Sequence, residues 1–154
     1  MFAIALQAGG CALIMVLIKP EDNLKLGIPE IDSQHEALIS LVNQLHETML
    51  QGTDKAALDG LLSRVLKHTQ THFAYEEELM SRYNYPGYKK HKSKHDKLIQ
   101  QLVDLTTRYK EGDLLLSFAV ELELKGWAVV HIEKLDKPLT TFLHNQKVME
   151  STAS

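Results

Sequence analysis

The sequence predicts an all-α protein, an up-down-up-down four-helix bundle preceded by an N-terminal extension. Four long blocks carry apolar residues three and four positions apart, the spacing of a helix with one buried face. Glycine and proline separate these blocks, and the short connections between them favour antiparallel neighbours. No block shows the alternation that is typical of a strand. We therefore expect an apolar extension at 1–18, a helical bundle at 19–146 and a flexible tail at 147–154.

The extension at 1–18 is apolar but contains Gln7 and Gly9. It is shorter than the roughly 20 residues that a membrane-spanning helix needs, so stable membrane insertion is not expected. A secretory signal carries lysine or arginine near its start, whereas the first basic residue here is Lys19. Met15 is a candidate natural start, which would make the preceding residues an upstream extension without function. We therefore expect a cytoplasmic location.

The first helix is expected from about Ser33 to Gln51, after an irregular lead-in that contains Gly27 and Pro29. Asp32 is a good N-cap residue for this helix. The core-facing stripe comprises His35, Leu38, Val42, Leu45 and Met49.

The other three helices follow turns that contain glycine. The second runs from the Gly52-Thr53-Asp54 turn to about Tyr83, and the third covers roughly 88–110, after a break at 84–87. The fourth runs from about Leu114 to Lys137, just before Pro138. Each has its own apolar stripe in helical register.

The overall charge argues against nucleic acid as a partner. The formal net charge is -3 and the isoelectric point is near 6.2, so no positive field would hold nucleic acid or anionic lipid. Lysines gather between Lys89 and Lys97, where a solvated helix face explains them. The single cysteine, Cys11, excludes an intrachain disulfide and suits a reducing compartment.

Five histidines and two carboxylates fall on the four predicted helices where side chains should face the core. They are His35, His72, Glu76, His91, His95, His131 and Asp136. An unpaired carboxylate in an apolar core is costly and usually has a partner or a metal. Antiparallel pairing brings the start of the first predicted helix beside the end of the second, and the start of the third beside the end of the fourth. All seven groups lie at these ends, so they are expected at one level of the bundle. The sequence therefore predicts a metal site.

Spacing alone leaves the choice of some groups open. His72 and Glu76 are four residues apart on one helix face, but His68 and His72 have the same spacing. Glu77 and Glu78 are further carboxylates that rotate toward solvent, so the position of Glu76 on the stripe favours it.

His131 and Asp136 are five residues apart, about 140° out of line on an ideal helix. Pro138 cannot donate to the carbonyl of Lys134, so a loosened last turn would swing Asp136 inward. An exposed surface charge at Asp136 is the alternative.

The number and type of ligands narrow the choice of metal. Seven groups are too many for one ion but suit two ions bridged by carboxylates. Zinc would more often take four ligands including cysteine, and no cysteine lies in the predicted bundle. Histidine-rich, carboxylate-bridged iron fits best. Because no general acid or base stands out, an open iron position would suit a small neutral ligand such as dioxygen.

Four motifs stand in order along the chain: IDSQH at 31–35, HFAYEEELM at 72–80, HKSKH at 91–95 and HIEKLD at 131–136. Together they closely resemble the bacteriohemerythrin family, over about 27–143. The resemblance implies a four-helix bundle whose non-haem di-iron centre binds dioxygen reversibly. By motif position, His91, His95 and His131 would hold one iron. His35 and His72 would hold the other, whose sixth position is left for dioxygen.

The resemblance also implies that Glu76 and Asp136 bridge the two irons, alongside an oxo or hydroxo group, as the ions change between Fe2+ and Fe3+. It thereby chooses the two carboxylates that spacing left open. An oxygen-consuming enzyme is a candidate recipient of the dioxygen. A di-iron oxidase or peroxidase, or an oxygen or redox sensor, is the alternative function. Ferritin-like di-iron enzymes use more carboxylates and Glu-x-x-His motifs, which favours the binding protein.

Two positions depart from the family pattern. The family usually has tryptophan seven residues before the glycine of the lead-in, where this chain has Pro20, and the apolar extension is a candidate replacement for that tryptophan. Three residues before the last histidine, a leucine usually crowds the oxygen pocket, but WAVVHI places Ala128 there. Leucine to alanine should leave a cavity or admit water, so we expect Ala128 to speed autoxidation.

Overall fold

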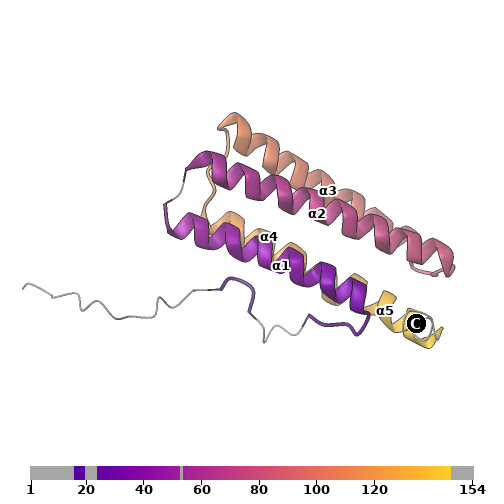
Figure 1. Ribbon diagram of the computed structural model, residues 1–154. Coiled ribbons are helices and arrows are strands. Elements are labelled where there is room, and N and C mark those ends of the chain that lie inside the picture. The colour runs from indigo at the N-terminus through magenta and orange to yellow at the C-terminus, as the bar shows by residue number, and fades with distance from the viewer. Residues whose placement is uncertain (1–15, 20–23, 53, 147–154) are drawn as a thin grey trace, which may run out of the picture.

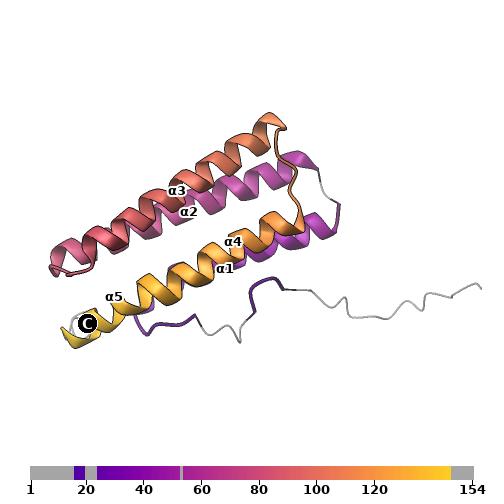
Figure 2. The same cartoon turned by 180° about the vertical axis from the view of Figure 1, so that it is seen from behind.

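The described residues form an all-α bundle, as the sequence predicts. The computed structural model describes residues 16–19, 24–52 and 54–146. Its helices are α1 (Pro29–Leu50), α2 (Lys55–Arg82), α3 (Tyr88–Glu111), α4 (Phe118–His131), the π-helical turn η2 (Ile132–Asp136) and α5 (Lys137–Asn145). In Figure 1, α2 and α3 lie side by side in one layer, and α1 lies beside α4 in the other. The reverse view in Figure 2 shows the same two layers.

The start of α1 differs from the prediction. The helix begins at Pro29, whose fixed φ suits a first helical turn, so the expected start near Ser33 is wrong. Asp32 is not the N-cap. Its carboxylate instead accepts hydrogen bonds from the backbone N–H groups of Leu26 (2.7 Å) and Gly27 (3.0 Å). Asp32 thus ties the lead-in to the first turn of α1.

The ends of α2 and α3 follow the turn signals closely. Asp54 caps α2 by accepting a hydrogen bond from the N–H of Ala57 at 2.9 Å. Gly112 ends α3 in the left-handed conformation, with φ of 81°, which glycine adopts without steric cost. The fourth helix begins later than expected, at Phe118 rather than Leu114, because Ser117 provides the N-cap.

Pro138 does not end the last helix, and the expected end at Lys137 is wrong. A π-helical turn, η2, precedes the proline, and the N–H of Lys137 bonds to the carbonyl of Ile132, five residues back. Pro138 then sits in the first turn of α5, where its missing N–H is tolerated. The chain continues as a helix to Asn145.

The buried polar residues divide the apolar core into two clusters. The larger contains Leu38, Leu45, Val65 and Leu102, among others. The smaller lies toward the α2–α3 turn and contains Ile31, Leu79, Met80, Leu139 and Leu143. Because His35 lies between Ile31 and Leu38 on α1, the predicted metal site falls between the two clusters.

A short segment before α1 packs on the bundle. Leu17 and Ile18 are buried in the larger core cluster. The N–H of Ile18 donates to Asn43 Oδ1 at 2.9 Å, and the Asn43 side-chain amide donates to the Ile18 carbonyl at 3.1 Å. Pro20, Cys11, Met15 and the expected tail at 147–154 lie outside the described residues. Among the helices that are described, none combines the length and apolar character that crossing a membrane requires.

A buried histidine–carboxylate pair lies at the end of the bundle away from the predicted metal site, and it was not predicted from the sequence. His46 Nδ1 on α1 lies 3.0 Å from both carboxylate oxygens of Glu121 on α4. Both side chains are buried, and Phe118 lies beside the imidazole. This pair links α1 to α4 far from the predicted metal site.

Candidate metal centre

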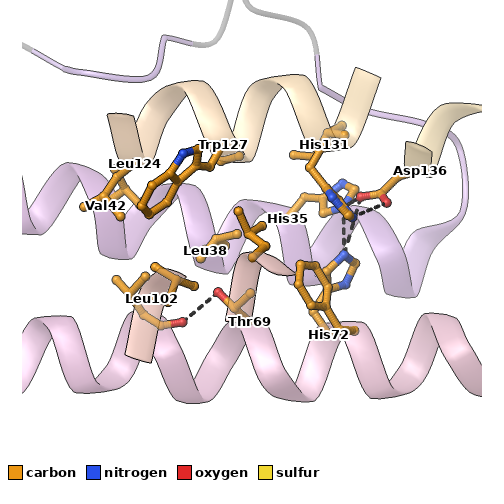
Figure 3. Close-up of a pocket in the computed structure, with 15 residues that line it drawn as sticks. His35, Leu38, Val42, Thr69, His72, Leu102, Leu124, Trp127, His131 and Asp136 are labelled. Carbon is orange, nitrogen blue, oxygen red and sulfur yellow. Dashed lines mark hydrogen bonds and ion pairs between the residues drawn. The ribbon is translucent and has the colours of Figure 1, made fainter. Parts of the chain in front are cut away.

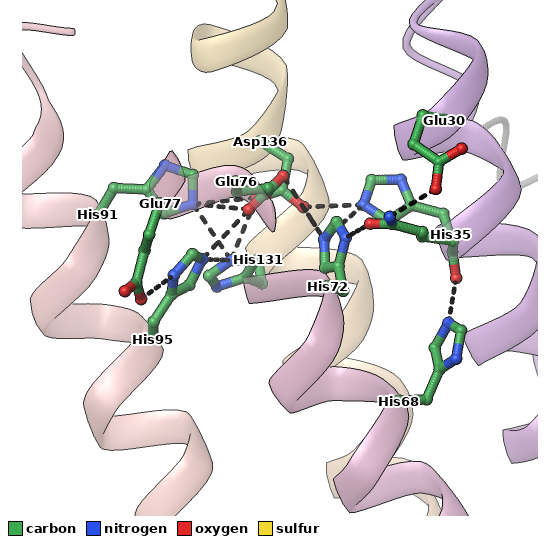
Figure 4. A network of polar contacts seen from close by, with 11 residues as sticks. Glu30, His35, His68, His72, Glu76, Glu77, His91, His95, His131 and Asp136 are labelled. Carbon is green, nitrogen blue, oxygen red and sulfur yellow. Dashed lines mark hydrogen bonds and ion pairs between the residues drawn. The ribbon is translucent and has the colours of Figure 1, made fainter. Parts of the chain in front are cut away.

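The structure brings all seven predicted ligand side chains together at one level of the bundle. His35 comes from α1, His72 and Glu76 from α2, His91 and His95 from α3, His131 from the end of α4 and Asp136 from the end of η2. Figure 4 shows their polar atoms pointing toward one another. All are buried, and His131 is the most exposed at 8%.

The first group of donors contains three histidines. His95 Nε2 lies 3.1 Å from His131 Nε2, and His91 Nε2 lies 3.4 Å from the same atom. The four-residue spacing of His91 and His95 places both imidazoles on one face of α3. Three imidazole nitrogen atoms therefore converge on one point.

The second group contains two histidines. His35 Nε2 lies 3.1 Å from His72 Nε2, and their rings meet edge to face. The rival ligand, His68, lies outside this group. Its Nε2 hydrogen bonds instead to the backbone carbonyl of Gln34 at 2.9 Å.

The two carboxylates lie between the histidine groups, and each presents one oxygen to each side. Glu76 Oε2 is 3.2 Å from His95 Nε2, whereas its Oε1 is 3.5 Å from His72 Nε2. Asp136 Oδ1 is 3.1 Å from His131 Nε2, whereas its Oδ2 is 3.0 Å from His35 Nε2. The cluster thus forms two donor sets that share both carboxylates.

The π-helical turn explains how Asp136 reaches the cluster. On an α-helix, Asp136 would point about 140° away from His131. In η2 the hydrogen bonds span five residues, so the turn is wider and residues five apart lie much closer to one face than on an α-helix. The loosened turn expected before Pro138 is therefore a defined π turn.

The spacing and hydrogen bonding of these side chains suit bound metal ions better than hydrogen bonds within the cluster. Neither oxygen of Glu76 has a hydrogen-bond partner, although the side chain is fully buried. A buried carboxylate without a partner is costly, and a cation removes that cost. Two donors at right angles, each about 2.1 Å from one ion, would lie about 3 Å apart. The observed spacings of 3.0–3.6 Å match that geometry.

The pKa shifts show how strongly burial acts on the cluster. Burial, with the nearby Asp136, raises the pKa of Glu76 well above its usual range. Burial would also raise the pKa of Asp136, but hydrogen bonds from His131, His35 and others hold it well below normal. Burial and neighbouring histidines lower the pKa of His95 to about 2. His95 is therefore a neutral donor near pH 7, as metal binding requires.

Three residues around the cluster orient its histidines, and the sequence analysis did not identify them. His72 Nδ1 lies 2.7 Å from Gln34 Oε1, and His95 Nδ1 lies 3.0 Å from Glu77 Oε1. Phe73 stacks on the His95 ring with centroids 3.7 Å apart. Glu77 was expected to face solvent, but it is the outer partner of a cluster histidine. Such partners fix the ring orientation of metal-binding histidines.

A small apolar cavity of about 30 Å³ lies beside the second donor set. In Figure 3, His35 and His72 border it at one end, and Trp127 and Leu124 at the other. Ala128 lines it as well, at the position where the family resemblance places leucine. The space exceeds the roughly 10–15 Å³ that one water needs. The cavity therefore has room for a diatomic molecule next to the four-donor set.

Comparison with known proteins shows that the chain is similar to hemerythrins in both sequence and structure. The model of the hemerythrin HHE cation binding domain matches residues 26–142. The bacteriohemerythrin of Stenotrophomonas maltophilia is 34% identical over 125 residues, covering 80% of this chain and 79% of the relative. That of Aquifex aeolicus is 32% identical, covering 79% and 93%. A solved wild-type hemerythrin superimposes with a TM-score of 0.71 at 28% identity, covering 75% of this chain and 88% of the other. A leucine-to-tyrosine mutant of hemerythrin gives 0.77 at 26%, covering 82% and 97%.

Proposed function

Because the chain belongs to the hemerythrin family, we propose that it binds dioxygen reversibly at a di-iron centre, for oxygen carriage, storage or delivery. The observation that carries the proposal is the asymmetry of the two donor sets. One set has five donors and the other has four, and they share Glu76 and Asp136. The cavity borders both histidines of the four-donor set, where an ion with one protein ligand fewer would have room for dioxygen.

In this proposal, His91, His95 and His131 would hold one iron, and His35 and His72 would hold the other. Glu76 and Asp136 would be shared between the two, since each directs one oxygen to either set. Histidine and carboxylate donors without thiolate suit iron of changing valence. Two bound iron ions would supply the electrons that hold dioxygen reversibly.

The protein's own part is to admit a small neutral molecule and to exclude water and anions. The cavity wall is largely apolar, and Thr69, which lines it, already donates its hydroxyl to the Val65 carbonyl at 2.8 Å. A water molecule in the cavity would find few partners there, so a resident water is disfavoured, although the space is large enough for one to pass through. Such a site favours dioxygen over charged ligands.

The lining of the cavity also favours binding over catalysis. Its ionisable members among the described residues are His35, His72, His131 and Asp136, all of which belong to the donor sets. No further side chain there is placed to act as a general acid or base for a substrate.

Anaerobic reduction followed by exposure to air tests the proposal. We expect two irons per chain and a visible oxy band that disappears under vacuum and returns with air. Irreversible oxidation with consumption of peroxide would instead indicate a di-iron enzyme. One iron per chain, or zinc, would contradict both functions.

A matched pair of variants tests the bridging role. Glu76→Gln removes one negative charge between the two donor sets, so the iron content should fall below two per chain. Glu78→Gln makes the same change on an exposed residue of α2, and it should keep both irons. Equal iron content in the two variants would contradict the bridging role of Glu76.

A further inference from the structure

An open groove lies between α3 and the α4–η2 segment, on the outer surface of the bundle. Its volume is about 640 Å³, within the range of sites for small organic molecules. Leu98, Trp127, Val130 and Leu135 supply its apolar surface, and the Val130 side chain is 56% exposed. An open apolar groove of this size suggests a ligand.

Four lysines border the groove: Lys90, Lys94 and Lys97 from α3 and Lys134 from η2. No carboxylate lines it, and within the described part of the chain none of these lysines forms an ion pair. The neighbouring Lys92, by contrast, binds Asp96 at 2.8 Å. A protein with a net charge of -3 therefore concentrates uncompensated positive charge around one apolar groove.

The charges are not spread evenly along the groove. Because α3 and α4 are antiparallel, the start of α3 lies beside η2, so Lys90, Lys94 and Lys134 gather at the end nearest the metal centre. The other end is formed by Gln101 and Gly126, which carry no charge. Lys90 and Gln101, which mark the two ends on α3, are eleven positions apart, a rise of about 16 Å along the helix.

We propose that this groove binds a single-chain anionic amphiphile, a long-chain carboxylate. The carboxylate group lies among the lysines of α3 and η2, and the hydrocarbon chain lies along the apolar floor toward Gly126. The volume of the groove, its length along α3 and the position of its lysines at one end all suit a molecule with one charged end and one hydrocarbon chain. This ligand is separate from dioxygen, and its binding does not depend on the proposed oxygen chemistry.

The groove also lies directly against the internal cavity. Leu98, Trp127 and His131 line both spaces. His131 is the most exposed side chain of the metal cluster, so a bound amphiphile would cover its outer side. The ligand would thus shield the metal centre from solvent on this face.

Titration of the full-length protein with dodecanoate, below its critical micelle concentration, tests the proposal. Trp127 is the single tryptophan, so its fluorescence reports on the groove itself, and calorimetry gives the stoichiometry. We expect saturable binding of one molecule per chain. Dodecyltrimethylammonium, which has the same chain and the opposite charge, should bind at least tenfold more weakly. Equal binding of the two would overturn the proposal.

Charge-reversal variants locate the headgroup. Lys94→Glu with Lys134→Glu should weaken dodecanoate binding at least tenfold. Lys67→Glu with Lys89→Glu changes the net charge equally at exposed positions outside the groove, and it should bind as the wild type does. Equal weakening in both pairs would overturn the proposal. If the first pair fails to fold by circular dichroism, glutamine at the same two positions makes the comparison.

A further variant locates the hydrocarbon chain. A Cβ atom at Gly126 would meet nothing within 4 Å, so a larger side chain is accommodated there and blocks the uncharged end. Gly126→Phe should weaken dodecanoate binding while leaving hexanoate binding unchanged. An unchanged affinity for dodecanoate would contradict the placement of the chain. If an acidic helical peptide binds in the groove and dodecanoate does not, the partner is a protein and the proposal is wrong.

Discussion

Replacing Ala128 with leucine should slow the autoxidation of the oxygen-loaded protein. Ala128 lines the cavity beside His35 and His72, and leucine adds three carbon atoms to that wall. The added atoms would occupy the space through which water or an anion reaches the second donor set. We therefore expect the oxy form to last several-fold longer in the leucine variant.

The size of the cavity sets the expected change in stability. A cavity of about 30 Å³ costs about 0.7 kcal/mol, at about 24 cal/mol per Å³. Filling it should raise the free energy of unfolding by up to that amount, which corresponds to a rise of about 1–3 °C in Tm for a chain of this length. Overpacking would have the opposite sign and would cost about 1–3 kcal/mol.

Decay of the visible oxy band in air measures the autoxidation rate, and thermal unfolding measures the stability. Ala119→Leu is the control, because Ala119 is exposed on the same helix. An unchanged autoxidation rate in Ala128→Leu would refute the reasoning. So would a loss of stability greater than about 1 kcal/mol, since the leucine would then not fit the cavity.

Three other predictions test the surroundings of the site and the far end of the bundle. Glu77→Gln weakens the partner of the His95 imidazole, so iron affinity should fall about 10-fold or more, whereas exposed Glu78→Gln should leave it unchanged. Glu121→Ala leaves His46 buried without its partner, so denaturant melts should show a loss of about 3 kcal/mol with iron content unaltered. In the metal-free protein the free energy of unfolding should fall between pH 6.5 and 5. Burial lowers the pKa of both His72 and His95, that of His95 to about 2, so there the unfolded chain binds two protons that the folded chain does not, whereas the raised pKa of Glu76 lets the folded chain bind only one extra proton. Equal urea midpoints at the two pH values would contradict this.

The helices were predictable because their signals are local. Asp54 and Gly112 mark turns through side-chain capping and a left-handed conformation, and both act where the sequence indicates. The start of α1 was missed because Asp32 can cap a helix or bind a loop, and only the position of the lead-in decides between the two. Pro29, which suits a first helical turn, was the better signal.

The convergence of the seven polar residues was predictable from periodicity and antiparallel packing, but their outer partners were not. Glu77 lies one residue beyond Glu76, so helical periodicity turns it away from the core. It nevertheless reaches His95 on the neighbouring helix. The position of Asp136 likewise depends on a π turn, a backbone choice that no side-chain pattern specifies. Contacts between helices and departures from α-helical geometry depend on the tertiary structure, so the spacing of residues in the sequence does not predict them.

The buried polar side chains that suit the site to metal binding destabilise the fold when no metal is bound. They separate two apolar clusters that would otherwise pack continuously, and the Glu76 carboxylate among them is buried without a hydrogen-bond partner. Asp136 is better supported, by four histidines, but only because the helix departs from its regular form at η2. A cation shared by both carboxylates relieves these costs together. Metal affinity and folding stability would therefore be coupled in this bundle, because the residues proposed as metal ligands are those whose burial is least favourable without a cation.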